Sequence, residues 1–230
     1  MLSGYYFVSY IDDFDDLFKI LKKKKREEEE DHFIHADLLN INYSSGHLTG
    51  ITENGLPLDY PLHKKALNYI LRKLSMPTGY FSQLMEEGRY RLVSDNIRYK
   101  LEELDNERFF LRLGYDIDRR THFVRGFLTE SYSVYDDIDI VKELREINLF
   151  KPYEFESYES VGYLSRMDFF KDELFGLRII NSEVGFSGLK LLPLIRTEDG
   201  GRIAFYDGKK PEHLVRHAYR TKSDFNDWLK

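Results

Sequence analysis

The stretch that decides the fold runs from residue 108 to residue 129 and reads RFFLRLGYDIDRRTHFVRGFLT. Apolar residues occupy every second position from Phe109 to Ile117, which is the period of a half-buried strand. The polar residues 118–120 then predict a turn into a second strand over Thr121–Thr129. This stretch therefore predicts an antiparallel hairpin in the middle of the chain.

Helices and further strands are predicted on both sides of this hairpin. Asp12 and Asp13 can cap a helix whose apolar positions recur at helical spacing. Further helices are expected from 61, from about 77, and over 89–104, 137–148, 211–219 and 223–229. Further strands are expected over 1–10, in short pieces over 33–60, and at roughly 153–168, 174–182, 187–196 and 202–206.

The order of these elements predicts the fold class and the domains. Strands and helices are mixed, and most gaps between strands have hairpin length, so we expect an α+β fold. Its sheet should be mainly antiparallel, with hairpins, and its helices should pack on one face. We expect residues 1–60 to form an N-terminal extension of strand, charged helix and hairpin, and residues 61–230 to form the main domain. One continuous domain is the alternative.

Composition excludes several classes of protein. The chain has 230 residues, 42% of them hydrophobic, which is enough to build a core. It has no cysteine, so a disulfide scaffold, a thiolate zinc site and a cysteine nucleophile are excluded. No apolar run approaches the ~18 residues of a membrane helix, and the N-terminus lacks a signal-peptide pattern, so we expect a cytoplasmic protein. A single glutamine beside many charged residues suggests a hot habitat.

The charges are distributed unevenly. Residues 1–60 carry 6 basic and 12 acidic side chains, which accounts for the whole net charge of −6. The last 40 residues are locally basic, so the acidic balance does not exclude a phosphate-binding face. The block of Lys and Arg at 22–26, followed by acids at 27–31, is interpreted as a solvated helix extension with i,i+4 ion pairs. A basic patch for DNA is the alternative.

Motifs of catalysis and of nucleotide binding are scarce. The sequence contains no Walker loop, no GxGxxG after a strand, no GxSxG elbow and no HExxH. His213 and His217 stand four residues apart, but no third ligand is evident, so we predict no metal site. A metal-dependent nuclease remains an alternative. Its carboxylates could come from Asp136, Asp139 and Glu183, and its lysine could be Lys190.

Basic residues among aromatic ones form the strongest pattern. Single-strand binders need cations that track phosphates and rings on which bases stack. Arg125 lies within a predicted strand and is followed by Tyr132 and Tyr135, whereas Arg178 lies within another and is followed by Lys190. This pattern favours binding of single-stranded nucleic acid.

Two segments resemble signatures of a phage- and plasmid-encoded family that is catalogued as a domain of unknown function. They are RGFLTESYSVYDD at 125–137 and INSEVGFSGLKLLP at 180–193, supported by LSMP at 74–77. Arg216 and His217 fall where this family often carries a basic residue and a histidine. The resemblance implies a mobile-element protein that acts in the host cytoplasm. It also suggests a relation to phage single-strand annealing proteins, which build rings or filaments on an α+β unit.

The leading hypothesis is an annealase-like protein of a phage or mobile element that binds single-stranded DNA without sequence preference, in recombination or replication. Annealing requires no bond chemistry, so no catalytic residue and no cofactor is predicted, and the expected partners are single-stranded DNA and further copies of the chain. The alternatives are the nuclease, or another DNA-processing enzyme, and a phage module that binds other proteins. The predicted nucleic-acid-binding residues are Arg125, Tyr132, Tyr135, Arg178, Lys190, Arg196, Arg202, Arg216, His217 and Arg220.

Overall fold

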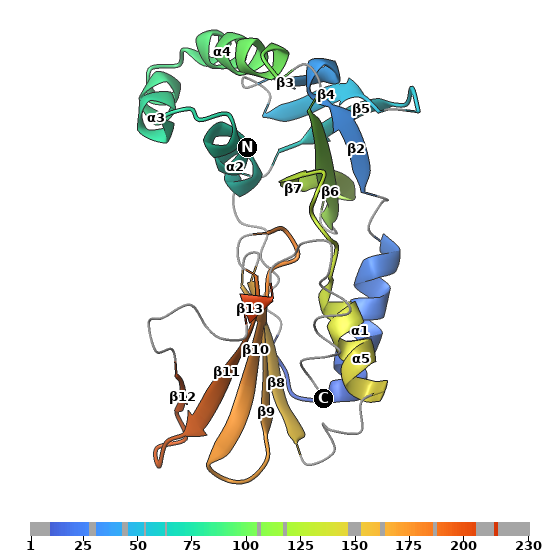
Figure 1. The fold of residues 1–230 in the computed structure, drawn as a ribbon, viewed down its shortest axis with the longest axis vertical. Helices are drawn as coiled ribbons and strands as arrows, with labels where there is room; N and C mark the ends of the chain where they lie inside the picture. Colours follow the sequence, from blue (N-terminus) through green and yellow to red (C-terminus); the bar gives the residue numbers. More distant parts are fainter. Residues whose placement is uncertain are drawn as a thin grey trace. The chain divides into compact units, whose positions relative to one another are not determined.

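The structure is a computed structural model, and it describes most of the chain (Figure 1). The described residues are 10–27, 31–42, 46–52, 54–62, 64–104, 107–116, 119–146, 153–161, 164–185, 188–205 and 214–215. They confirm the predicted α+β class with antiparallel sheets.

The chain divides into two compact units. Unit 1 comprises residues 1–5 and 27–130, and unit 2 comprises residues 6–26 and 131–230. The expected boundary at residue 60 falls inside β5 (Pro57–Pro61), a strand of unit 1. The periodicity of a segment shows that it has a buried face, but it does not show which core that face joins.

Unit 1 combines two three-stranded antiparallel sheets with helices. The first sheet has the order β2-β6-β7 and the second the order β3-β4-β5. The strands are β2 (His32–His35), β3 (Leu39–Asn42), β4 (His47–Ile51), β5 (Pro57–Pro61), β6 (Arg108–Asp116) and β7 (Thr121–Thr129). The helices are the short 3₁₀ turn η1 (Ala36–Leu38), α2 (Lys64–Lys73), α3 (Thr78–Glu86) and α4 (Tyr90–Glu102).

The central hairpin forms as predicted, with one irregularity. β6 and β7 pair in register from Phe109 opposite Thr129 to Asp116 opposite Thr121. Arg112 lies opposite Gly126 while Leu113 lies opposite Val124, so Arg125 is the additional residue of a β-bulge. A bulge breaks the simple alternation of side chains, and strand periodicity alone cannot locate it.

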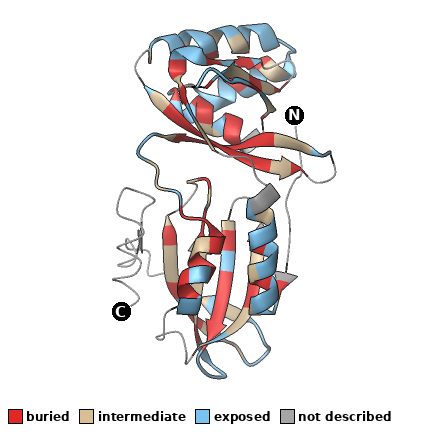
Figure 2. Cartoon of the chain, turned by 90° about the vertical axis from the view of Figure 1, so that its right-hand side faces the viewer, coloured by how far each residue is buried: buried red, intermediate tan, exposed pale blue. Residues whose placement is uncertain are grey.

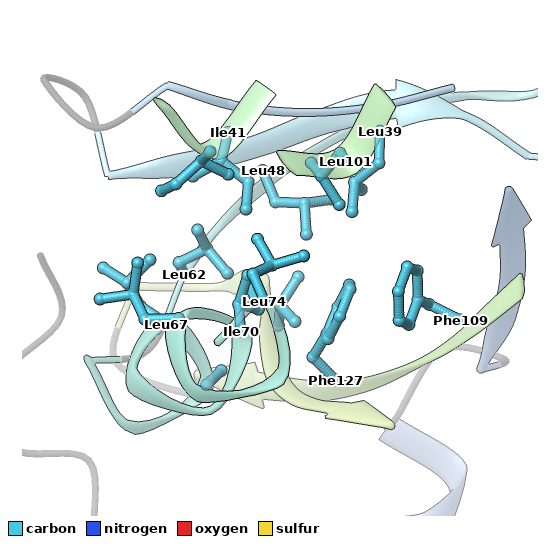
Figure 3. Packing of buried hydrophobic residues seen from close by; sticks show 14 of the residues in the cluster. Leu39, Ile41, Leu48, Leu62, Leu67, Ile70, Leu74, Leu101, Phe109 and Phe127 are labelled. Carbon is cyan, nitrogen blue, oxygen red and sulfur yellow. The ribbon is translucent and has the colours of Figure 1, made fainter. Parts of the chain in front are cut away.

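The core of unit 1 lies between its sheets and its helices (Figure 3). Phe109 and Phe127, from the two strands of the hairpin, stack with their ring centroids 4.4 Å apart. Figure 3 shows them beside Ile70 of α2 and Leu74, which follows α2 directly, and with residues of the second sheet. Ala66 and Ile70, which the helical spacing indicated, are buried in this core together with Leu67 and Leu71 of the same helix.

Unit 2 is built on one antiparallel sheet with the order β1-β8-β9-β10-β11-β12, with β13 also paired to β11. Its strands are β1 (Tyr10–Ile11), β8 (Glu154–Val161), β9 (Leu164–Phe170), β10 (Phe175–Asn181), β11 (Leu189–Arg196), β12 (Arg202–Ala204) and β13 (Leu214–Val215). Its helices are α1 (Phe14–Glu27) and α5 (Asp137–Glu146).

Both helices of unit 2 pack on one face of this sheet. Leu17 of α1 and Val141 of α5 share a buried cluster with Met167, Phe169 and Ile179 of the strands. Figure 2 shows these central strands as largely buried. The backbone N–H of Asp16 donates to Asp13 Oδ1 at 2.7 Å, which is the cap expected at the start of α1.

Two expectations differ from the structure in this unit, and two fall largely outside the described residues. The strand expected over 153–168 is a hairpin of two strands, β8 and β9. Residues 214–215 form a strand that pairs with β11, so the helix expected over 211–219 is wrong at these residues. The expected helix over 223–229 and most of the expected strand over 1–10 lie outside the described residues.

Candidate nucleic-acid interface

The sheet of unit 2 carries polar residues on the face opposite its helices. Met167 and Phe169 of β9 belong to the core beneath α1 and α5, so the alternate residues Arg166 and Asp168 point to the other face. Arg178 of β10 lies directly opposite Asp168 and extends this pattern across the strands. We call this surface the polar face, and its polar members are Ser157, Glu159, Arg166, Asp168, Arg178, Lys190, Arg196 and Arg202.

Cations outnumber acids on the polar face. Arginine or lysine side chains come from β9, β10, β11 and β12, namely Arg166, Arg178, Lys190, Arg196 and Arg202. Their acidic partners are Glu159 on Arg166, Asp168 on Arg178 and Arg202, and Glu156 on Arg196. Glu154 of β8 lies opposite Phe170 and so belongs to the same face, so five cations stand against four carboxylates and the excess of positive charge is small.

Asp168 organises the centre of the polar face. Its carboxylate accepts hydrogen bonds from Arg178 Nε and Nη2, both at 2.7 Å, in a bidentate pair. Arg202 Nη1 donates to the same carboxylate at 3.0 Å and also to the hydroxyl of Ser157. The hydrogen bond to Asp168 raises the pKa of Arg178 above its usual value, so this guanidinium stays charged. One buried carboxylate thus fixes two guanidinium groups side by side.

A cavity of about 190 Å³ opens at this centre. It is lined by Ser157, Glu159, Arg166, Asp168, Arg178 and Arg202. Three of the lining residues are arginines and two are acids, so the cavity is suited to an anion. A volume of this size corresponds to roughly six water molecules at about 30 Å³ each.

Arg196 lies over an aromatic ring beside this centre. Its guanidinium carbon is 4.1 Å from the centroid of the Phe170 ring, and its Nη2 is 2.9 Å from Glu156 Oε2. The ring itself is 5% exposed. Phe170 therefore supports the arginine and offers no free face to a ligand.

The structure brings together four of the predicted site residues. Arg178, Lys190, Arg196 and Arg202 all lie on the polar face, on three consecutive strands of one sheet. Sequence reasoning missed Arg166, Asp168, Ser157 and Glu159 because it treated 153–168 as one strand. The alternation of Arg166, Asp168 and Phe170 with core residues would have placed the first two on the same face as Arg178.

Tyr135 does not form a stacking platform. It is 2% exposed, and its hydroxyl donates to Glu143 Oε2 at 2.8 Å. Burial and the Glu143 carboxylate raise the pKa of Tyr135 far above its usual range. Tyr132 is half-buried, and its hydroxyl donates to the carbonyl of Ser182 at 3.3 Å. Both tyrosines thus contribute to the structure of unit 2.

Arg125 likewise does not lie on a nucleic-acid surface. It belongs to unit 1, where it is the bulged residue of β7 and is 6% exposed. Its side chain packs over Gly114 of β6, where an added Cβ would come within 3.3 Å of Arg125 Cδ and 2.9 Å of the Phe123 ring. The other three predicted residues, Arg216, His217 and Arg220, lie outside the described residues.

The Asn-Ser-Glu-Val-Gly segment (181–185) links the end of β10 to the start of α5 through hydrogen bonds. Asn181 Nδ2 donates to the Tyr135 carbonyl at 3.1 Å and to Asp137 Oδ1 at 2.8 Å. Glu183 Oε1 accepts from the backbone N–H of Asp137 at 3.1 Å. Asn181 and Glu183 thus cross-link the start of α5, which is distant from them in sequence.

Asp137 lies at the centre of this polar network. Its carboxylate accepts hydrogen bonds from Tyr158 at 2.9 Å and Ser165 at 2.7 Å, in addition to Asn181. Burial, and then the nearby charge of Glu183, raise the pKa of Asp137 to about 6. A carboxyl group of this kind is held as a structural acceptor and is removed from solvent.

Two of the three acids proposed for a nuclease are engaged by lysines of α1, and the third, Asp139, pairs with Lys142 of α5. Lys24 Nζ lies 2.9 Å from Glu183 Oε2, and Lys25 Nζ lies 2.8 Å from Asp136 Oδ2. Lys190 lies on the polar face, whereas Asn181, which binds Asp137, lies on the face that carries the helices. Within the described ranges, no three acidic or histidine side chains are grouped to hold a metal ion. The arrangement that the nuclease requires is therefore not formed by the described residues.

The charged block of α1 thus has a role that the sequence did not indicate. Lys24 and Lys25 make ion pairs with acids near the start of α5 and after β10, whereas the i,i+4 partners expected for them, at 28 and 29, lie outside the described residues. Helical spacing cannot show that the acids are supplied by residues more than 100 positions away.

Comparisons with family models, curated proteins and solved structures find no match for this chain. The resemblance to the phage family therefore stays a prediction. Among the helices that the structure describes, none is both long enough and apolar enough to cross a bilayer.

Proposed function

We propose that this protein binds single-stranded DNA without sequence preference through the polar face of unit 2, and that it acts as an annealase-like protein. The observation that carries the proposal is the grouping of five cations from four neighbouring strands on one face. Cations in rows on a sheet can neutralise successive phosphates of an extended strand, which is the main source of affinity for nucleic acid.

The absence of an exposed ring among the described residues of the polar face bears on the mode of binding. Phe170 is buried beneath Arg196, so bases gain no stacking platform there. Binding on the polar face therefore rests on contacts to the sugar-phosphate backbone, which leave the pairing edges of the bases free for a complementary strand.

Fluorescence anisotropy tests the proposal. A labelled single strand of ~30 nucleotides and its duplex are titrated with the full chain at several salt concentrations. We expect tighter binding of the single strand and a linear fall of log K with log salt, with a slope of about −0.7 for each phosphate contact. The protein should also accelerate the annealing of complementary strands under the same conditions. Annealing is measured by the loss of a fluorophore's signal when the strands pair.

Matched variants connect the binding to the polar face. Lys190→Ala should lower affinity for all sequences alike and reduce the salt slope by about 0.7. Arg91→Ala removes an equal charge from α4 in unit 1, where Arg91 is largely exposed, and should change neither quantity. Absence of binding to either form of DNA at low salt would contradict the proposal and favour the protein-binding alternative.

A further inference from the structure

The cavity on the polar face differs from the rest of that face, because it is enclosed by charged side chains that are already fixed in place. Asp168 is 3% exposed and holds Arg178 and Arg202 from two sides. Side chains that are held before the ligand arrives lose little conformational freedom on binding. Such preorganisation is typical of a binding site and is not needed for a loose electrostatic surface.

The hydrogen bonds to Asp168 use only part of each guanidinium group. Arg178 binds Asp168 through Nε and Nη2, which leaves the edge formed by Nη1 and Nη2 for a second acceptor. Arg202 binds Asp168 and Ser157 through Nη1, which leaves its Nε and Nη2 edge. Each arginine therefore retains a two-donor fork of the kind that matches phosphate oxygens.

Size and charge select the chemical group that enters. At about 190 Å³ the cavity is smaller than the roughly 300–1,000 Å³ of pockets that enclose drug-sized ligands, so a phosphate fits better than a whole nucleotide. Arg166, Arg178 and Arg202 outnumber Glu159 and Asp168 among the lining residues. A phosphate monoester has close to two negative charges at pH 7 and three acceptor oxygens, whereas a diester inside a strand has one charge.

We infer that this cavity binds the terminal phosphate monoester of a nucleic-acid strand. The inference rests on the proposed function, and it adds that the protein recognises a strand end as well as the strand. Arg178 and Arg202 supply bidentate contacts to the phosphate, Arg166 adds a third cation at the rim, and Asp168 acts as a positioning residue that fixes the two forks.

The test compares strands that differ only at their ends. Single strands of one sequence and ~30 nucleotides, with a 5′-phosphate, a 3′-phosphate or hydroxyl groups at both ends, compete for the wild-type chain in anisotropy assays. We expect one phosphorylated strand to bind about tenfold more tightly than the hydroxyl strand, and which end prevails identifies the source of the phosphate. Inorganic phosphate should abolish this advantage, whereas chloride at equal ionic strength should not.

Variants separate the cavity from the rest of the polar face. Arg178→Lys and Arg202→Lys keep the charge but lose the fork, so the ratio of the affinities for the phosphorylated and the hydroxyl strand should fall to about one. Lys190 lies outside the cavity lining, so Lys190→Ala should weaken all three strands equally and preserve the preference. Thermal unfolding shows whether each variant is folded, and the wild-type comparison of ends does not depend on the variants.

Two results would overturn the inference in distinguishable ways. Equal affinity for all three strands would contradict end recognition but would not contradict the proposed binding of single strands. Failure to bind any strand at low salt removes the proposed function, and end recognition with it.

Discussion

Asp137 is the residue whose environment has the clearest consequence for stability. Its pKa is raised to about 6 in the folded protein, mainly by burial, against about 3.9 in an unfolded chain. The folded state therefore retains a proton between pH 4 and 6 that the unfolded state releases, so this carboxyl lowers the free energy of unfolding as the pH rises through that window. Asp137→Asn removes this titration, and the loss of stability that it causes should be smaller at pH 7 than at pH 4, by about 2 kcal/mol. Urea unfolding at pH 4, 5, 6 and 7 measures the difference.

Asp172 provides a control with the opposite sign. Backbone N–H groups of Phe175 and Leu174 lower the pKa of Asp172, so its stabilising effect is present above the unfolded pKa and is lost as the pH falls through the folded one. The cost of Asp172→Asn should therefore be larger at pH 7 than at low pH.

Parallel curves of unfolding free energy against pH for wild type and Asp137→Asn would show that Asp137 has an ordinary pKa.

Sequence reasoning failed most often in predicting whether a single side chain is exposed or buried. Arg178 and Lys190 were predicted to contact phosphates because they are basic residues among aromatic ones, and the structure places both on the polar face. Arg125 and Tyr135 have the same local character, but one occupies a β-bulge and the other binds Glu143 in a core. Local sequence does not contain the tertiary partner that covers a side chain.

At the scale of elements, α1 is held in unit 2 by its lysines as well as by its apolar face. Lys25 reaches Asp136, which is 2% exposed, at 2.8 Å. Loss of a charged partner from a buried carboxylate costs roughly 1–3 kcal/mol, so Lys25→Met, which keeps most of the stem, should lower the free energy of unfolding by that amount. Lys19→Met breaks an exposed pair with Asp16 on the same helix and should have almost no effect. Urea denaturation at neutral pH compares the two, and equal effects would mean that the Lys25–Asp136 pair is no more than a surface contact.

Elements with strong local patterns were predicted well, and those defined by distant pairing were not. The hairpin of β6 and β7 and the helices α2 to α5 follow from alternation, helical spacing and caps. The hairpin of β8 and β9 was missed because its two strands were treated as one continuous run. The strand β13 exists through its pairing with Leu189 and Lys190, and nothing in residues 214–215 themselves specifies that partner.

At the scale of the whole molecule, the fold class followed from the order of elements, but the division into units did not. The chain contributes α1 to unit 2 before it forms unit 1, and it returns to unit 2 only after residue 130. A continuous boundary, such as the one expected at residue 60, cannot represent this path. The buried clusters of the two units share no residue, so each unit has a hydrophobic core of its own.

Because each unit has its own core, we expect a core substitution in one unit to destabilise mainly that unit. Ile97 of α4 and Met167 of β9 are both fully buried, one in each core. Truncation of either to alanine should cost about 2–5 kcal/mol, through lost burial and the cavity that remains. Hydrogen exchange measured by mass spectrometry should then rise for Ile97→Ala in the strands β6 and β7, and for Met167→Ala in β8 to β11, while the other unit keeps its protection. If hydrogen exchange instead rose equally in both units for each variant, the two cores would unfold as one cooperative unit.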